Sequence, residues 1–580
     1  MKRLLADQGE PCFAIVVEQH LPQSVYAAGE LRFYLGMITG VPFEIADAAE
    51  GNRIRLDQRE LPELGHDGFR LETAETELTI TGGVRGIIYG VYEFLEQLGC
   101  RFFTTEAEKV PYVPEAEMPE LHLQKKPLLE YRMHYTYDFN HCFRFAAKLR
   151  INGSDIPEKF GGGMKYVWFV HSLDHIIPQA EFAQTHPEYF AMRNGKRFLP
   201  EKAGDGQRCL TNPDVLEISV ERVRAALKSH PECRMISISQ LDNMNFCTCP
   251  ECAKVDAEEG SSAGTVLRFV NAVASRLRDE FPDVIFDTLA YVYSRPAPKL
   301  VRPAENVCVR LCSIECCFAH TFDKCDDTTW WAKRPDGTRT SFLSDLRDWS
   351  RICDRLYVWD YVTQFSHYPV PFPNWHTLQP NLQTMVENNV KGVFEQGHSA
   401  RGGGADLLEL RQYLIAKLLW DPYCDLERHM TEFLEYFYGP AAPVIREYIE
   451  TICSKCEKDN IHVYFNDRPT GQHLEEPMLD QYDEILSRAE AAVGNADPLY
   501  RVRIKRIQLG LRYVRLKRDS MLRDRNDPEA LNRFFSEWRA YGFTCPHESA
   551  SAESAHRAFL KKCWRGEELD EPQYEFGDTQ

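Results

Sequence analysis

The chain has 580 residues, of which 43% are hydrophobic and 27% are charged, a composition typical of a soluble globular protein. This length exceeds what one hydrophobic core normally organises, so we expect several domains. The formal net charge of -19 argues against nucleic acid as the main partner, because phosphate binding needs a basic surface.

The first residues contain no apolar run long enough for a secretion signal, since Asp7, Glu10 and Glu18 interrupt it. No other stretch reaches the roughly 20 apolar residues that a membrane helix needs. We therefore predict a cytoplasmic protein with no membrane partner, whose 19 cysteines stay mostly reduced. No Walker loop, HExxH motif or GxSxG nucleophile elbow is present, so we expect no cofactor. Nothing in the sequence indicates an oligomeric state.

Residues 1–125 have the pattern of a small α/β accessory domain. Residues 12–19, CFAIVVEQ, predict a strand, and residues 22–40 predict a helix that ends at a glycine. Residues 68–83 alternate between polar and apolar side chains as a hairpin does. Residues 83–103 predict a helix that leads into a strand.

The pattern changes near residue 126, and short apolar strands then alternate with helices as far as residue 425. Eight segments rich in β-branched and aromatic residues are predicted strands: LLEYRMHYTY, AAKLRINGS, KYVWFVHSL, RMISISQLDN, VIFDTLAYVYS, VCVRLCSIECC, RLYVWDYV and KGVFEQG. Eight strand–helix units predict a (β/α)8 TIM barrel. The alternative is an open doubly wound sheet, which we favour less because no dinucleotide fingerprint is present.

Residues 426–580 are predicted to form a helical C-terminal domain. Four segments have amphipathic or nearly amphipathic patterns: DLERHMTEFLEYFYG, PAAPVIREYIETICSKCEKD, EPMLDQYDEILSRAEAAVG and PLYRVRIKRIQLGLRYVRLKRDSML.

Catalytic groups of a TIM barrel gather at the C-terminal ends of its strands. Carboxylates follow four of the predicted strands, and they are Asp242, Glu315, Asp360 and Glu395. Other side chains at these ends could bind a sugar: His171, Asn243, Tyr291, His320, Trp359, Tyr361 and Gln396. The set suits glycoside hydrolysis, because one carboxylic acid must protonate the leaving oxygen while a second group stabilises or attacks the oxocarbenium-like centre.

Glu395 is the leading candidate, because it ends an apolar strand where burying an unpaired charge is costly. The glycines at 402–404 follow it, and we expect that this loop approaches a ligand closely or moves over it.

The other strand-end residues also have plausible structural roles. Asp360 could be an internal ion-pair partner, and Glu315 could be the buried partner of an arginine such as Arg310. Asp242 could cap the loop that follows its strand, as aspartate often does. A histidine in the position of His171 is also commonly a core or loop residue.

A second motif, FCTCPECAKVD, places Cys247, Cys249 and Cys252 at C-x-C-x2-C spacing. Thiolates at such spacing can share a structural zinc ion, which would need a fourth ligand. Candidates that only folding could bring close are Cys209, Cys312, Cys316 and Cys317. The alternatives are a loop of free thiols or a single disulfide.

Several long motifs resemble glycoside hydrolase family 163, whose core was long known only as a domain of unknown function. The resemblance covers most of residues 125–440. It lies in SISQLDNMNFCTCPECAKVDAEEGSSAGTVLRFVNAVA, VCVRLCSIECCFAH, RLYVWDYVTQFSHYPVPFPN, NVKGVFEQG and LLELRQYLIAKLLWDP. The segment GGVRGIIYGVYEFLEQLGCRFF resembles the accessory domain that precedes the barrel in α-glucuronidases and β-hexosaminidases.

The resemblance implies a retaining endo-β-N-acetylglucosaminidase that acts on complex-type N-glycans. In such enzymes the substrate's own 2-acetamido group serves as the nucleophile, while one carboxylate orients it and another protonates the leaving oxygen. The absence of an export signal departs from the family's usual setting and favours imported oligosaccharides over intact glycoproteins as substrates.

Two alternatives remain at this point. One is an inverting hydrolase of the α-glucuronidase type, which would need an arginine or lysine facing the uronate carboxylate. The other is a carbohydrate-binding barrel without catalytic activity, since a fold alone never proves activity.

Overall fold

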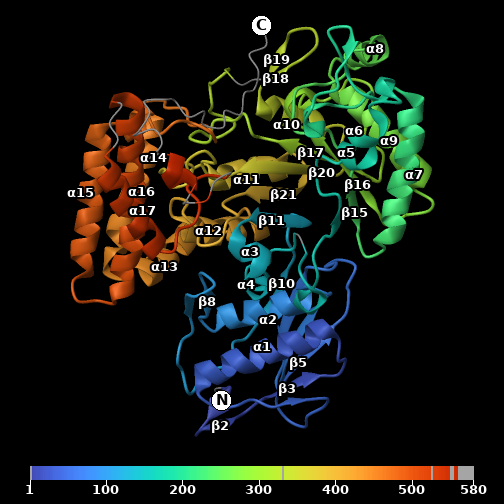
Figure 1. The fold of residues 1–580 in the computed structure, drawn as a ribbon. Helices are drawn as coiled ribbons and strands as arrows, with labels where there is room; N and C mark the ends of the chain where they lie inside the picture. Colours follow the sequence, from blue (N-terminus) through green and yellow to red (C-terminus); the bar gives the residue numbers. More distant parts are fainter. Residues whose placement is uncertain are drawn as a thin grey trace.

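The computed structural model describes residues 3–153, 155–329, 332–523, 527–548, 551 and 554–558. Figure 1 shows three regions, with the N-terminal sheet domain at the bottom, a central parallel sheet surrounded by helices, and a group of helices at the left. The domain boundaries at residues 125 and 425 stay predictions.

The N-terminal region is a six-stranded sheet covered by two helices. The strand order is β10-β6-β7-β5-β3-β4, with bounds β3 Ala14–Val17, β4 Ile45–Ala46, β5 Arg53–Gln58, β6 Phe69–Thr73, β7 Glu77–Gly82 and β10 His122–Lys125. Helices α1 (Pro22–Thr39) and α2 (Gly86–Gln97) pack against each other and against the sheet. Helix α1 begins with a proline and ends at Gly40, whose φ of 80° suits a left-handed cap.

The central sheet contains seven strands, all parallel. Their order is β11-β21-β20-β17-β16-β15-β12. Their bounds are β11 Tyr131–Tyr135, β12 Tyr166–Val167, β15 Met235–Ser237, β16 Ile285–Ala290, β17 Val307–Cys312, β20 Leu356–Tyr361 and β21 Val390–Gln396. The first strand pairs with the last, so the sheet curls into a partial barrel.

The predicted second strand at residues 146–154 is not formed. Helix α4 (Phe143–Lys148) occupies its beginning, and Ser154 lies outside the described residues. A single parallel bridge joins Gly153 to Met164, and the backbone N–H groups of Asn152 and Gly153 donate to the carbonyl of Arg132. These contacts lie between the two edge strands of the sheet, β11 and β12. Seven of the eight predicted strands are formed.

Helices lie between and after the strands of the curled sheet in the chain, and some of the longer ones pack against its strands. They are α3 (Tyr137–His141), α4, α5 (Leu173–Ile176), α6 (Gln179–Phe182), α7 (Pro213–Ser229), α8 (Pro250–Glu259), α9 (Ala263–Leu277), α10 (Phe342–Ser350), α11 (Leu378–Glu387) and α12 (Leu408–Trp420). The described residues of the C-terminal region include the helices α13 (Leu426–Tyr438), α14 (Ala442–Lys458), α15 (Glu476–Val493), α16 (Pro498–Arg523) and α17 (Pro528–Ala540).

The interior of the curled sheet is filled by one arginine and aromatic rings. Arg310 is fully buried, pairs with Asp287 at 3.2 Å and lies over the rings of Tyr131, Tyr357 and Phe394, among others. These residues identify the inner face of strands β11, β20 and β21, because side chains alternate between faces along a strand.

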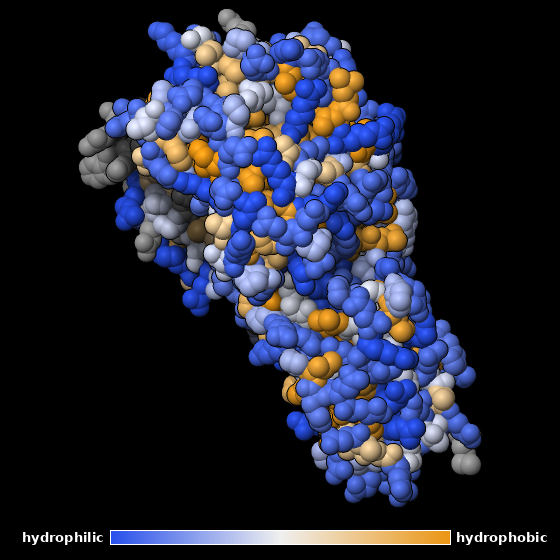
Figure 2. All heavy atoms as spheres, turned by 90° about the vertical axis from the view of Figure 1, so that its right-hand side faces the viewer, coloured by the Kyte–Doolittle hydropathy of each residue, from blue (hydrophilic) through white to orange (hydrophobic). Residues whose placement is uncertain are grey.

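No helix in the described part of the chain is long and apolar enough to cross a membrane. The face of the molecule in Figure 2 is largely hydrophilic, with hydrophobic residues scattered across it.

Candidate active site

An open pocket of about 780 Å³ lies at the C-terminal ends of the strands of the curled sheet. Its polar lining residues are His171, Asp242, Tyr291, Tyr361, Gln396 and Glu548. Its apolar and aromatic walls are Val170, Leu289, Cys312, Ile314, Trp359, Phe365 and Phe465. The pocket thus offers rings for apolar contact and a few polar groups for orientation, as ligand sites commonly do.

Asp242 is the predicted catalytic carboxylate that lines this pocket. It lies in the loop after β15, exposed to solvent, and its Oδ1 accepts a hydrogen bond of 2.9 Å from the hydroxyl of Tyr291. Burial raises the pKa of Tyr291 well above its usual value, and the charge of Asp242 adds to the shift. Tyr291 therefore stays protonated and holds the carboxylate in a fixed orientation.

His171 lies beside this pair with a defined proton position. Its Nδ1 is 2.8 Å from the carbonyl oxygen of Gln240, and because a carbonyl only accepts, Nδ1 carries the hydrogen. The backbone here is strained, since His171, Trp168 and Val292 have φ values of 53°, 52° and 50°. Such conformations cost roughly 1–3 kcal/mol each and cluster at functional sites.

Glu548 is a second carboxylate of the pocket, and sequence reasoning missed it. Its Oε1 accepts from Nε2 of Gln396 at 3.0 Å, while Oε1 of Gln396 accepts from Nε1 of Trp359 at 2.9 Å. The backbone N–H of Glu548 donates to the carbonyl of Phe365. Glu548 follows α17, more than 150 residues after the last strand, so no local signal connects it to the strand ends.

The structure does not bring Glu395 or Asp360 into the pocket. The two residues lie side by side in the register of β21 and β20, on the face opposite to Gln396 and Trp359. Both are buried, and Oδ1 of Asp360 accepts from the hydroxyl of Ser313. Side chains alternate along a strand, so adjacent residues at a strand end face opposite directions. The catalytic roles of Glu395 and Asp360 stay predictions.

Burial makes this pair of carboxyls weakly acidic. Desolvation raises the pKa of Glu395 well above its usual range, and the charge of Asp360 adds to the effect. Desolvation likewise raises the pKa of Asp360 to about 6, against the hydrogen bond from Ser313. Burial thus favours the protonated form of Glu395 over its carboxylate.

Glu315 is also outside the lining of the main pocket. Its carboxylate forms an ion pair of 3.1 Å with Arg295, which also pairs with Asp345 at 2.8 Å. The structural role weighed for Glu315 thus has a partner in Arg295, whereas Arg310 pairs with Asp287.

Two predicted substrate-binding residues have other partners. The side chain of Asn243 holds its own loop, donating to the carbonyl of Gly204 at 2.8 Å and accepting from the backbone N–H of Asn245 at 2.9 Å. His320 lies next to Cys317, with Nδ1 at 3.3 Å from Sγ. Neither lines the pocket.

The glycine loop at 402–404 packs away from the pocket, which corrects the expectation that it covers a ligand. A Cβ at Gly402 would collide with the carbonyl oxygen of Gly542, and the hydroxyl of Thr544 donates to the carbonyl of Arg401. Gly404 instead lines a separate cavity between the loop and the C-terminal helices. The three glycines have positive φ values, which explains the residue type.

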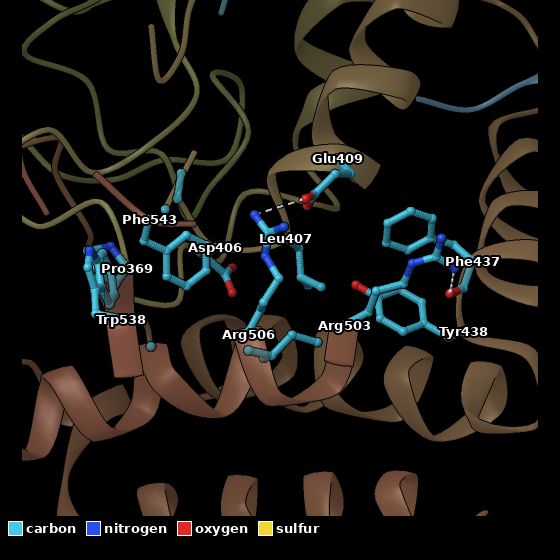
Figure 3. A pocket seen from close by; sticks show the side chains of 14 residues that line it. Pro369, Asp406, Leu407, Glu409, Phe437, Tyr438, Arg503, Arg506, Trp538 and Phe543 are labelled. Carbon is cyan, nitrogen blue, oxygen red and sulfur yellow. Dashed lines mark hydrogen bonds and ion pairs between the residues drawn. The ribbon is translucent and has the colours of Figure 1, made fainter. Parts of the chain in front are cut away.

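Figure 3 shows this second cavity. Arg506 on α16 pairs with Glu409 at 3.2 Å, and Arg503 donates to the carbonyl of Phe437 at 2.6 Å. Both arginines of α16 thus bind groups on α12 and α13. We therefore interpret the cavity as a gap in the packing of these helices.

Two clusters in the described part of the chain have ligand atoms close enough to hold a metal ion. One contains Cys209, Cys247, Cys249 and Cys252, all buried, and the other contains Cys317, His320, Cys325 and His462. Folding therefore brings Cys209, and none of the other three candidates, to the C-x-C-x2-C motif. Both sets consist of ligands that zinc prefers.

Comparison with solved structures shows likenesses at low sequence identity. A family GH115 4-O-methyl-α-glucuronidase, BtGH115A, with specificity for decorated arabinogalactans, has a TM-score of 0.57 at 11% identity, covering 91% of this chain and 75% of its own. CpGH84B has a TM-score of 0.46 at 12% identity, covering 95% and 96%. A β-hexosaminidase of Streptomyces plicatus in complex with GlcNAc has a TM-score of 0.43 at 13% identity, covering 75% and 90%.

The first likeness shows a shared fold, whereas the other two TM-scores are too low to carry an argument. No curated protein matches the chain. A family model described as a domain of unknown function, DUF4838, matches residues 102–450. Because this match covers more than half of the chain, the protein belongs to the DUF4838 family.

Proposed function

We propose that the protein is a glycoside hydrolase that cleaves β-N-acetylglucosaminide linkages in oligosaccharides of the complex N-glycan type. The observation that carries this proposal is the pocket at the strand ends, where Asp242, oriented by Tyr291, lies among aromatic walls. The fold shared with a glycoside hydrolase and the motifs that resemble glycoside hydrolase family 163 support it.

The reaction we propose uses the substrate's acetamido group and two carboxyl groups. The acetamido oxygen attacks the anomeric carbon as the bond to the leaving oxygen breaks, and water later opens the cyclic intermediate with net retention. Asp242 accepts the amide N–H and orients the group. Glu548, held by Gln396, is our candidate for the acid that protonates the leaving oxygen.

The lining favours an N-acetylglucosaminide over a glucuronide. None of the pocket-lining residues in the described chain is arginine or lysine, whereas a uronate carboxylate would call for such a partner. Leu289, Ile314 and Trp359 provide an apolar wall against which an acetamido methyl can pack. A binding protein without activity remains as an alternative outcome of the test.

The test is hydrolysis of an aryl β-N-acetylglucosaminide, an aryl α-glucuronide and a complex-type N-glycan. We expect the wild type to cleave the N-glycan or the aryl β-N-acetylglucosaminide, and Asp242→Asn and Glu548→Gln each to lower kcat by about 10²–10⁴-fold. Glu395→Gln is the matched control, because Glu395 is a buried acid outside the pocket.

The outcomes separate the alternatives. Cleavage of the glucuronide alone would replace the proposed substrate. Binding of an N-glycan without cleavage of any substrate would favour the inactive binding protein. Full activity of Asp242→Asn would refute the role of Asp242.

A further inference from the structure

We propose that the chain holds two structural zinc ions, which fix two loops at the rim of the pocket. The four-cysteine site consists of Cys209, Cys247, Cys249 and Cys252, and the Cys2His2 site consists of Cys317, His320, Cys325 and His462. Within each site all ligand atoms lie within 4.8 Å of one another.

The sulfur positions of the four-cysteine site match tetrahedral coordination. Zinc–sulfur bonds of about 2.3 Å at tetrahedral angles place sulfur atoms about 3.8 Å apart. Sγ of Cys209 is 3.7 Å from Sγ of Cys249 and 4.0 Å from Sγ of Cys252. The backbone N–H of Met192 points at Sγ of Cys247 at 3.3 Å, a contact that suits a metal-bound thiolate.

The Cys2His2 site meets the same geometric test. With zinc–nitrogen bonds of about 2.0 Å, tetrahedral coordination places sulfur and nitrogen about 3.5 Å apart. Nδ1 of His320 is 3.3 Å from Sγ of Cys317, and Nδ1 of His462 is 3.9 Å from Sγ of Cys325. Nε2 of His462 is 3.2 Å from Asp326, and such a carboxylate is the usual support of a zinc-bound histidine.

The ligands come from segments that are far apart in the sequence. Cys209 precedes α7, while its three partners surround the start of α8. His462 lies between α14 and α15, while its three partners follow β17. A zinc ion would thus hold segments together where loops meet, in place of packing between helices and strands. The Cys2His2 site would join the central sheet to the C-terminal helices.

Each site is close in sequence to a residue of the pocket. Asp242 lies five residues before Cys247, and Phe465 lies three residues after His462. The backbone N–H of Phe318 donates to the carbonyl of Val463 at 2.8 Å, so the loop after β17 and the segment that carries Phe465 already run side by side. A zinc ion at the Cys2His2 site would lock this contact and hold Phe465 in the pocket wall.

Metal content tests the proposal independently of any enzymatic activity. The full chain is purified without chelator or added metal, and zinc and iron are measured per chain by mass spectrometry. We expect two zinc ions in the wild type, and a loss of one in Cys252→Ser and of one in His462→Asn. Cys12→Ser and His20→Asn, outside both clusters, are the matched controls and should keep two.

Replacing one zinc ligand by another distinguishes a loss of metal coordination from a loss of folding. His462→Cys supplies another zinc ligand and should keep both ions, and X-ray absorption at the zinc edge should then show more sulfur than in the wild type. Less than a quarter of a zinc ion per wild-type chain would overturn the proposal, as would stoichiometric iron in its place. If the wild type holds a single zinc ion, one of the two variants, Cys252→Ser or His462→Asn, will not lower the zinc content. The site that this variant changes would then not be a zinc site.

Discussion

Glu395→Gln should make the protein more resistant to unfolding as the pH rises, without removing its activity. Glu395 is 2% exposed, and burial followed by the charge of Asp360 raises its pKa well above the ordinary value. The neutral carboxamide of the variant resembles the protonated carboxyl that burial favours, so the substitution removes a titration.

The size of the effect follows from proton linkage. Between the unfolded pKa and the raised native pKa, the native state binds one proton more than the unfolded state. The contribution of this group to stability is therefore fully present below the unfolded pKa and is lost as the pH rises through the native pKa. Over this window the wild type loses about 1.4 kcal/mol per pH unit relative to the variant.

The assay is thermal unfolding from pH 5 to pH 8, followed by hydrolysis of the panel above. We expect the Tm of Glu395→Gln minus that of the wild type to increase steadily with pH, with kcat within about threefold of the wild type. Glu50→Gln, at an exposed loop position, should show no such trend. A Tm difference that does not depend on pH would refute the buried-acid argument, and a hundredfold loss of kcat with an intact fold would make Glu395 a catalytic residue.

Further predictions concern the pocket, the sheet interior and the glycine loop. Tyr291→Phe should lower kcat about 10–100-fold with little change in KM, because a hydrogen bond to a charged group contributes about 1.5–3 kcal/mol, whereas Tyr293→Phe, outside the pocket lining, should not. Asp287→Ala leaves Arg310 buried without its ion-pair partner and should cost about 3–5 kcal/mol of stability, measured as a large fall in Tm that the exposed control Asp283→Ala lacks. Gly402→Ala should lower Tm more than Gly337→Ala, because both positions have positive φ but only Gly402 faces a backbone carbonyl; equal effects would mean that strain alone acts there.

The sequence alone predicted most of the element types and their order, because periodicity and composition are local. Seven of the eight predicted strands of the central sheet are formed, and the helices after residue 425 appear where amphipathic patterns predicted them. The predicted second strand is not formed because its first residues are the last residues of helix α4, and a short apolar run does not distinguish a strand from a helix.

Two decisions at the site were left to the tertiary structure. The sequence predicts that Glu395 and Gln396 lie at the same strand end. Only the register against β20 decides that Gln396 faces the pocket and that Glu395 faces the opposite side of the sheet. Glu548 enters the pocket from beyond α17.

The two metal clusters follow the same division. The sequence alone shows the spacing of Cys247, Cys249 and Cys252. Cys209 and His462 join their clusters only through contacts between segments that are far apart in the chain. Local pattern therefore determined which residue types stand at the strand ends, and the three-dimensional packing of segments far apart in the chain decided which of them meet.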